Sequence, residues 1–245
     1  MREIRLDIID STNAYAKAHA SQWTGSEIVC ITAEEQTAGK GRQNRPWLSP
    51  RGVNLYVTFF FELSLSQPHV SCLSHIGALS VAEVLEEQGV SSRLKWPNDI
   101  WLNGKKTGGI LCETIVGRTT IQVVLGIGLN VNMGQEYLAA IDQSASSLML
   151  ETGKVWDKEV LLQQLQTRFV DNLEEFRERG FAPFHERFQE RMLYRGEMVS
   201  LSDEGKKWVG ICEGVSADGR LVLYERNNRE KRLLFNTGKI SPLGK

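Results

Sequence analysis

Apolar residues of the 245-residue chain recur with two spacings, one typical of strands and one typical of helices. Residues 27–32 (EIVCIT) and 53–63 (VNLYVTFFFEL) are rich in β-branched and aromatic side chains, and the second run is apolar on both faces. This composition predicts strands, and apolar character on both faces predicts that residues 53–63 form a central strand.

A hairpin is predicted in the middle of the chain. A turn at residues 97–99 leads into an apolar run, and the pair Asn103-Gly104 is typical of a tight turn between two strands. We therefore expect strands at residues 100–102 and 109–112, and residues 120–131 continue the same sheet.

Two segments carry apolar residues at helical spacing. Residues 69–89 predict an amphipathic helix that ends near Gly89, and residues 157–180 predict a longer one. The positions expected to face the core are Leu73, Ile76, Gly77, Ser80, Val81 and Val84 in the first helix, and Leu161, Leu165, Phe169, Leu173 and Phe176 in the second.

The pattern changes after Arg195 to short β runs separated by turns, one of them at residues 217–219. Such a run of short strands is typical of a small barrel attached to a larger domain. We predict a boundary near residue 192, with a main domain over 1–192 and a small β-barrel over 193–245.

Composition and charge exclude several classes of protein. The chain is 41% hydrophobic, and its net charge of −1 indicates no general basic surface for nucleic acid. The sequence has no signal peptide and no apolar run long enough to span a membrane, so we expect a cytoplasmic protein. The four cysteines and four histidines lack metal-ligand spacing, which predicts reduced thiols and no fixed metal site.

The stretch QTAGKGRQNRPW, residues 36–47, has the composition of an anion-binding loop. It is not a Walker A loop, because residue 34 is glutamate and residue 41 is glycine. Its glycines allow backbone N–H groups to approach an anion, and its basic side chains donate charged hydrogen bonds. These residues are Gly39 and Gly41, then Lys40, Arg42 and Arg45, with Trp47 as a stacking surface. A mobile surface turn is the alternative interpretation.

Three further stretches carry candidate chemistry. Residues 95–113 (KWPNDIWLNGKKTGGILCE) contain Lys106, although lysines at a hairpin are usually solvated. Residues 126–132 (GIGLNVN) lack the third glycine of a dinucleotide fingerprint but end in asparagines whose amides match an adenine edge. Residues 10–13 (DSTN) are by themselves most often a helix N-cap.

Together these four stretches, in this order, resemble the biotin protein ligase family. GKGRQNRPW matches the family's GxGRxxRxW loop, KWPND…KTGGIL matches a second motif, and GIGLNVN matches the family's GxGxNxN strand end. The resemblance covers nearly the whole chain. It implies an α+β fold of the class II synthetase-like biotin/lipoate ligase type, in which helices flank a central mixed β-sheet, with a small C-terminal Src-homology-3-like β-barrel.

The resemblance also implies an activity. Biotin and ATP, with Mg²⁺, would form biotinyl-5′-AMP and pyrophosphate, and the biotinyl group would then pass to a lysine of a biotin carboxyl carrier protein. That carrier is a domain of acetyl-CoA carboxylase or a related carboxylase. The runner-up within the fold is a lipoate-attaching enzyme, and a different class is a non-catalytic regulator that binds biotin or a nucleotide.

Residue roles implied by the resemblance fall into three groups. The catalytic group is Lys106, Arg42 and Asp99. The biotin-binding group is Ser11, Thr12, Asn13, Gln36, Gly39, Lys40, Gly41, Arg42, Lys106 and Gly109. The ATP-binding group is Arg42, Arg45, Trp47, Lys95, Asn130 and Asn132.

The sequence departs from the family pattern at the loop. Lys40 stands where many members have arginine, and Gln43-Asn44 replace a common Arg-Gly pair; Asn44 tolerates a left-handed backbone, so we expect the turn to persist. Because the catalytic pattern begins almost at Met1, we also expect a ligase without a DNA-binding domain. A homodimer could form by sheet pairing through residues 53–63 or 120–131.

Overall fold

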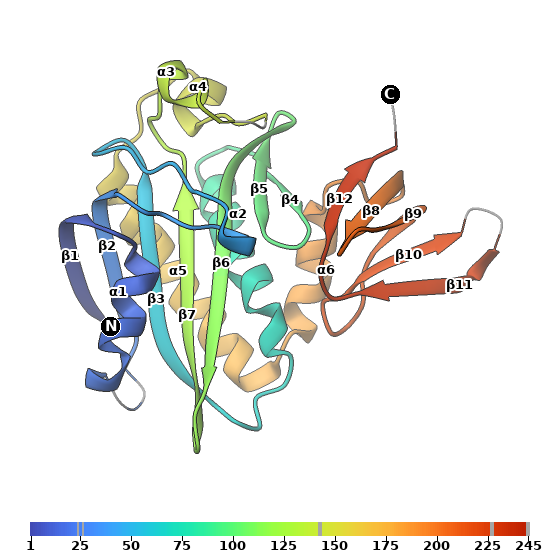
Figure 1. Cartoon of the computed structure of the whole chain (residues 1–245), viewed down its shortest axis with the longest axis horizontal. Coiled ribbons are helices and arrows are strands. Elements are labelled where there is room, and N and C mark those ends of the chain that lie inside the picture. Colours follow the sequence, from blue (N-terminus) through green and yellow to red (C-terminus); the bar gives the residue numbers. More distant parts are fainter. Residues whose placement is uncertain (24, 26, 142–143, 226–227, 244–245) are drawn as a thin grey trace.

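A seven-stranded sheet is the largest element of the chain (Figure 1). The computed structural model describes residues 1–23, 25, 27–141, 144–225 and 228–243. Strand order is β1-β2-β3-β7-β6-β5-β4; β1 pairs in parallel with β2, and the other neighbours are antiparallel. The strands are β1 Arg2–Ile9, β2 Val29–Gln36, β3 Leu55–Ser64, β4 Arg93–Lys95, β5 Asp99–Leu102, β6 Lys105–Val116 and β7 Thr120–Leu129. The predicted mixed sheet is therefore confirmed.

The central position predicted for residues 53–63 is also confirmed. β3 pairs with β2 on one side and β7 on the other, and its Phe59, Phe60 and Phe61 are all buried. Residues 120–131 form β7, which lies between β3 and β6. Both strands are central, and pairing of sheets across a two-fold axis through either of them does not apply, because both edges of each strand are already hydrogen-bonded.

Helices cover both faces of the sheet. Figure 1 shows α1 (Thr12–His19) in front of the sheet, with α2 (Leu73–Glu87) and α5 (Lys158–Arg179) behind it. The back layer holds the large hydrophobic core, and α1 closes a smaller one around Trp23 and Phe60. The remaining helices are α3 Gln135–Leu138, α4 Leu148–Thr152 and α6 Ala182–Arg191, with short 3₁₀ turns η1 Ala20–Gln22, η2 Arg42–Asn44 and η3 Val70–Cys72.

The predicted helix ends follow capping chemistry. The carboxylate of Asp157 accepts hydrogen bonds from the N–H groups of Glu159 and Val160, so α5 begins at residue 158. Gly180 follows α5 with φ 64°, and Gly89 follows α2 with φ 78°, a backbone conformation that favours glycine. Every core position predicted for the two helices is buried.

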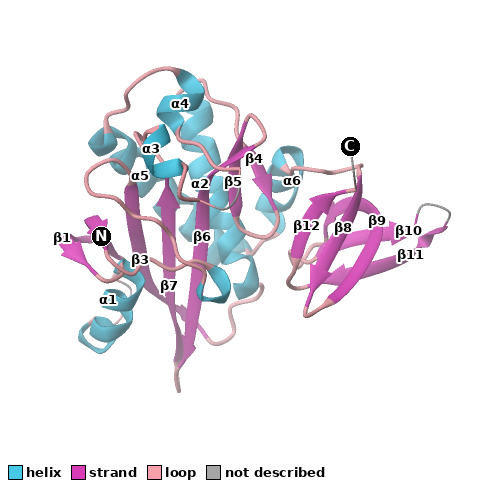
Figure 2. Cartoon of the chain, turned by 45° about the horizontal axis from the view of Figure 1, so that its top comes forward, coloured by secondary structure: helices cyan, strands magenta, loops and turns pink. Residues whose placement is uncertain are grey.

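The C-terminal residues form a separate five-stranded antiparallel sheet in the order β11-β10-β9-β8-β12 (Figure 2). Its strands are β8 Met198–Asp203, β9 Lys206–Val215, β10 Leu221–Glu225, β11 Asn228–Phe235 and β12 Lys239–Pro242. This confirms the predicted small Src-homology-3-like unit. Trp96 Nε1 donates to the carbonyl of Gly219 at 3.2 Å, and one hydrophobic core includes residues of both sheets. The division at residue 192 stays a prediction, since the interior is continuous across it.

Three sequence expectations concern thiols, membrane spans and metal ligands. All four cysteines are free thiols, and burial raises the pKa of Cys30 to about 11. No helix in the described part of the chain is long and apolar enough to cross a bilayer. Among the same residues, no group of three or more histidine, cysteine or acidic side chains is placed to hold a metal ion.

A buried charge network joins α2, α5 and α6. Arg187 on α6 donates to Glu83 on α2 through Nε at 2.9 Å and through Nη2 at 2.5 Å. Asn172 on α5 donates to the other oxygen of Glu83 at 3.1 Å and accepts from Arg187 at 3.0 Å. Only 10% of the Glu83 side chain is exposed, so this carboxylate depends on its protein partners instead of water.

We expect Arg187→Met to lower the free energy of unfolding by about 2 kcal/mol, because Glu83 loses the nearer of its two cations and keeps only Arg168, whose Nε lies 3.9 Å away. The loss is smaller than for a fully buried pair because Arg187 is partly exposed. Urea unfolding would measure it. Arg179→Met is the matched control: Arg179 pairs with Glu175 on the surface, so its loss should stay below about 0.5 kcal/mol. Equal losses in the two variants would contradict the role given to the network.

Candidate active site

Residues 36–47 form a hairpin that crosses in front of the sheet (Figure 1, blue). The Trp47 N–H donates to the carbonyl of Gly39, and the Gly41 N–H donates to the carbonyl of Arg45, each at 2.8 Å. These hydrogen bonds give the segment a defined shape, which the mobile-turn alternative does not provide.

The tip of the hairpin uses left-handed backbone. Asn44 has φ 56°, which confirms that the turn persists with asparagine in place of the usual glycine. Gln43 has the same φ, although glutamine favours this region less. Its side-chain oxygen accepts from Arg45 Nη2 at 3.0 Å, so the basic side chain of Arg45 stays at the exposed tip.

Glycines on two neighbouring strands allow Trp47 to lie on the sheet. A Cβ at Gly128 would come within 2.6 Å of the Trp47 indole, whereas one at Gly109 would stay 3.5 Å from it. Gly109 and Gly128 are directly paired between β6 and β7. The indole therefore rests on bare backbone, and its Nε1–H is buried without a partner among the described residues. A buried unpaired donor is costly unless a ligand accepts from it.

The residues 11–13 form one polar cluster at the start of α1. The Ser11 hydroxyl caps the helix by accepting from the Ala14 N–H, as the N-cap interpretation predicts. Thr12 donates from both N–H and Oγ1 to Gln36 Oε1, at 2.9 and 3.1 Å. The structure therefore brings the start of α1 and the end of β2 together, as expected for two parts of one site.

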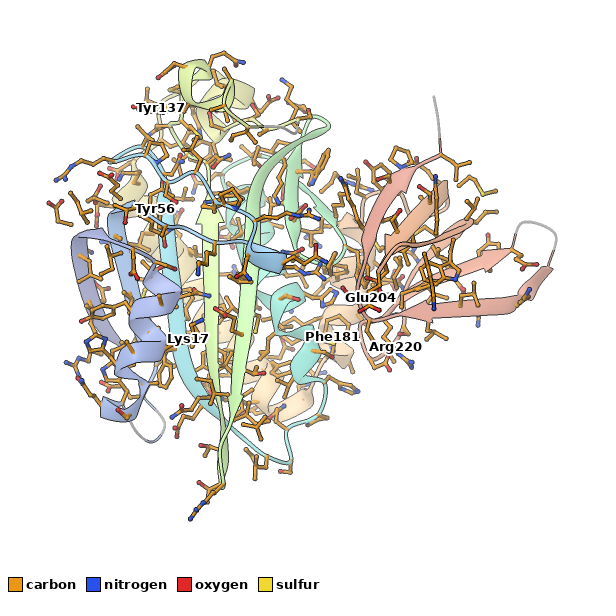
Figure 3. The ribbon with its side chains drawn as sticks, viewed as in Figure 1. Lys17, Tyr56, Tyr137, Phe181, Glu204 and Arg220 are labelled. Atoms are coloured by element: carbon orange, nitrogen blue, oxygen red, sulfur yellow. The ribbon has the colours of Figure 1, made fainter. Side chains whose placement is uncertain are left out.

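Asn13 is held in a single orientation. Its Oδ1 accepts from Thr58 Oγ1 at 2.7 Å, and its Nδ2 donates to Glu113 at 3.0 Å. Glu113 also pairs at 2.8 Å with Lys17, which projects from α1 (Figure 3). A Cβ at Gly126 would lie 2.3 Å from Asn13 Oδ1, so this glycine is required for the contact.

Lys106 and Asp99 form an ion pair at the centre of the site. Their Nζ and Oδ1 atoms are 2.7 Å apart, and the side chains are 15% and 20% exposed. Lys106 Nζ also lies 5.4 Å from the centre of a Trp47 ring. The solvated-hairpin alternative therefore fits Lys105, whose side chain is 48% exposed, but not Lys106.

Lys95 adds a second half-buried cation beside the pair. Its Nζ lies 4.6 Å from the centre of a Trp101 ring. Burial lowers the pKa of Lys95; the charge of Asp99 opposes this, and the charges of Lys239 and Lys106 add to it. The site is thus locally cationic although the whole chain is nearly neutral.

Arg42 connects the hairpin to the C-terminal sheet. Its Nη2 donates to Thr237 Oγ1 at 2.7 Å, and its Nη1 donates to Asn98 at 3.4 Å. Burial lowers the pKa of Arg42, and the charge of Asp99 opposes that shift. Sequence reasoning missed Thr237, because nothing near it marks a contact to a loop almost 200 residues earlier.

The two asparagines predicted to bind the nucleotide, Asn130 and Asn132, form side-chain hydrogen bonds with the protein backbone. Asn130 Nδ2 donates to the Ser146 carbonyl at 3.0 Å. Asn132 donates to the Trp156 carbonyl and accepts from the Trp156 N–H, each at 2.9 Å. Both amides hold the segment that follows β7, so any contact they make with a base adds to this role.

A cavity of about 280 Å³ lies elsewhere, between the start of α5 and the ends of β1, β2 and β3. It is lined by charged residues that already pair with each other, Arg5 with Glu159 and Lys158 with Glu34. None of the predicted site residues lines it. The converging polar groups, and not this cavity, therefore define the candidate site.

Fold and site together are those of an α+β protein built to hold an anion. The model of the biotin/lipoate A/B protein ligase family matches residues 6–130, so the chain belongs to that family.

Comparison with individual proteins agrees with this assignment. The chain is 34% identical over 223 residues to the bifunctional ligase/repressor BirA of Escherichia coli, covering 90% of this chain and 68% of that protein. It is also 34% identical to the biotin–acetyl-CoA-carboxylase ligase of Paracoccus denitrificans, covering 87% and 90%. The biotin protein ligase of Aquifex aeolicus in complex with biotin and ATP has a TM-score of 0.80 at 32% identity, over 98% and 97% of the two chains.

Two glycine variants test the contact between Trp47 and the backbone of Gly109 and Gly128. We expect Gly128→Ala to lower the free energy of unfolding by roughly 1–3 kcal/mol, because its methyl group overlaps the indole. Gly109→Ala should change it by less than about 1 kcal/mol, since its methyl group meets only ordinary contacts. Denaturant unfolding would measure both. The packing described here would be refuted by a stable Gly128→Ala variant in which Trp47 has not moved.

Proposed function

We propose that the chain is an ATP-dependent biotin ligase, which forms biotinyl-5′-AMP and pyrophosphate and then transfers biotin to a lysine of a biotin carboxyl carrier protein. One observation carries the proposal: the half-buried Lys106–Asp99 pair lies beside Trp47 of the GxGRxxRxW hairpin. Biotin, ATP and the carrier are substrates, Mg²⁺ enters with ATP, and no fixed metal site is needed.

Biotin would lie between the start of α1 and the hairpin. We assign the polar ring of biotin to Ser11, Thr12, Asn13 and Gln36. Thr58 already links Thr12, Asn13 and Gln36 into one hydrogen-bonded cluster, and Ser11 precedes them as the cap of α1. Its carboxylate would extend toward the backbone of residues 39–41 and toward Gly109. Gly109 brings Trp47 and Lys106 to within contact distance of bare backbone, and Lys40 contributes charge at the exposed rim.

ATP would bind on the Lys106 side of the hairpin. Arg42, Lys95 and Lys106 are three cations around Asp99, and a triphosphate would be attracted to them. Trp47 offers its ring to the nucleotide, and Arg45 would fold over it from the exposed tip by giving up its hydrogen bond to Gln43. Asn130 and Asn132 would shape the base site through the backbone they hold.

The first step needs charge neutralisation more than base catalysis. Biotin's carboxylate is ionised at neutral pH, since aliphatic carboxyl groups have a pKa of roughly 4–5. An oxygen of this carboxylate attacks the α-phosphorus of ATP, and the bond to pyrophosphate breaks. Repulsion between carboxylate and polyphosphate opposes the approach, and Lys106 and Arg42 offset it while holding the two groups in line.

The second step needs a neutral amine on the carrier lysine. Asp99 is the candidate to accept its proton, but its carboxylate is paired with Lys106 at 2.7 Å. When Lys106 moves to the ligand's carboxylate and phosphate, Asp99 is released. The amine then attacks the mixed anhydride, and AMP leaves.

The partner and its surroundings follow from the activity. Similarity to biotin–acetyl-CoA-carboxylase ligases supports a carboxylase carrier domain as the protein substrate, in the cytoplasm. Self-association through sheet pairing would use an edge strand, and among the described residues the edges are β1 and β4 of the large sheet and β11 and β12 of the small one. Sedimentation with and without biotin and ATP would test a homodimer.

Pyrophosphate release with biotin and ATP, followed by transfer to purified carrier domains, tests the function. We expect biotin to be incorporated in preference to lipoate, and Lys106→Gln to lower the rate of adenylate formation on the order of 10²- to 10³-fold. Lys231→Met, which removes a surface lysine paired with Glu225, is the control and should retain full activity. Preference for lipoate would favour the lipoate-attaching alternative, and ligand binding without pyrophosphate release would favour the regulator.

Arg42→Gly tests retention of the intermediate. Loss of the Thr237 and Asn98 contacts frees the hairpin from the C-terminal sheet, so the adenylate should form but escape. We expect biotinylation of bystander proteins to rise, as measured by labelling of added albumin. Arg42→Lys, which keeps the charge without the two-pronged contact, should leak less. Tight retention in Arg42→Gly would refute the idea that the hairpin closes over the intermediate.

A further inference from the structure

A short extended segment runs beside the backbone of Lys106. The Lys106 N–H donates to the Ser144 carbonyl at 3.0 Å, and the Ser146 N–H donates to the Lys106 carbonyl at 2.9 Å. Residues 106 and 145 thus form a parallel bridge beside β6. Both backbone groups of Lys106 are fixed from outside its own hairpin.

One carboxylate joins this segment to the hairpin that carries Lys106. Glu151 on α4 accepts from Ser146 at 2.5 Å, from Asn103 at 2.8 Å and from Lys105 at 3.0 Å. Its side chain is only 8% exposed. Burial raises the pKa of Glu151, but the three hydrogen bonds outweigh burial and hold the pKa below its usual 4.5. The carboxylate is therefore ionised at neutral pH.

The three donors come from two places in the sequence. Asn103 and Lys105 flank the turn between β5 and β6, and Ser146 lies in the segment that follows β7. Asn103 adopts the left-handed backbone with φ 46°, so the turn presents its amide to α4 in a fixed geometry. Glu151 is the side chain that contacts both sides of the bridge at Lys106.

We propose that Glu151 is a positioning residue for Lys106: it anchors residues 144–146 to the β5–β6 turn, and so fixes the backbone from which the Lys106 side chain reaches the reacting carboxylate and phosphate. The inference rests on the proposed ligase activity, in which Lys106 acts on the transition state. It assigns no contact between Glu151 and substrate.

The physical reason is that a displacement of the Lys106 backbone also displaces the Nζ atom at the end of its side chain. The Lys106 side chain is long and flexible, so the position of its Nζ depends on the direction in which the strand presents it. Without Glu151, three donors lose their acceptor. Among the residues that the structure describes, residues 144–146 then keep their backbone bonds to Lys106 and the contact with Asn130. A displacement of about 1 Å at a catalytic group can lower the rate on the order of 100-fold.

Single-turnover adenylate formation, with biotin and ATP and pyrophosphate as the readout, tests the proposal. We expect Glu151→Ala to lower this rate on the order of 10-fold, while the biotin dissociation constant changes by less than about two-fold. Glu151→Gln keeps one acceptor oxygen, so its rate of adenylate formation should lie between those of the unaltered protein and Glu151→Ala. Glu136→Ala removes an exposed carboxylate on α3 and serves as the matched control.

A double-mutant cycle separates positioning from general destabilisation. If Glu151 acts through Lys106, Glu151→Ala should cost less than about two-fold further in a Lys106→Gln background. A full further 10-fold loss there, or no loss in the single variant, would overturn the proposal. Absence of adenylate formation in the unaltered protein would instead overturn the ligase function on which it rests.

Amide hydrogen exchange supplies a readout independent of activity. In Glu151→Ala, the amides of Lys106 and Ser146 should exchange faster, while those of β3 and β7 keep their protection. Unchanged exchange at Lys106 and Ser146 would also overturn the proposal. Loss of protection across the whole sheet would show a structural role only, and would overturn it as well.

Discussion

The site depends on the bare front face of two neighbouring strands. Successive residues of a strand point to opposite faces, so Gly126 and Gly128 leave the front of β7 without side chains while Leu125 and Ile127 fill the core behind it. Gly109 of β6 extends the bare surface sideways, because it pairs with Gly128. Asn13 and Trp47 can approach the backbone only here. A methyl group at Gly126 or Gly128 would fill the space they use.

The charged side chains around the bare surface then determine which ligands can bind there. Arg42, Lys95 and Lys106 lie near this surface, and Asp99 is an anion that acts on all three. Like charges held close by a rigid backbone repel, and a carboxylate and a phosphate arriving together relieve that repulsion. In the proposed mechanism Asp99 therefore has two roles: it holds Lys106 before the ligands bind, and it accepts the proton of the carrier lysine afterwards.

Sequence reasoning succeeded where local physics dominates. The two-faced apolar run of β3, the capped ends of α5 and the Asn-Gly turn each depend on neighbouring residues. It missed β1, whose apolar positions are separated by Arg2, Glu3, Arg5 and Asp7 and which forms the sheet edge. It also missed the three-residue β4 and the charge-rich α6, since α6 is stabilised by Arg187 and its distant partners.

Sequence reasoning is limited in the same way at the candidate site. An asparagine amide suits an adenine edge and a backbone carbonyl equally well, so the sequence could not tell that Asn130 and Asn132 hold the backbone of Ser146 and Trp156. Motifs identify side chains expected to contact a ligand, but the residues that position those side chains lie far away in the chain. Thr237 fixes Arg42 from the C-terminal sheet, and Glu151 reaches both sides of the bridge at Lys106. Because the two anchors lie on different elements, the positions of Arg42 and Lys106, the two charged groups assigned to the reacting atoms in the proposed mechanism, can be adjusted independently of the glycines on β6 and β7.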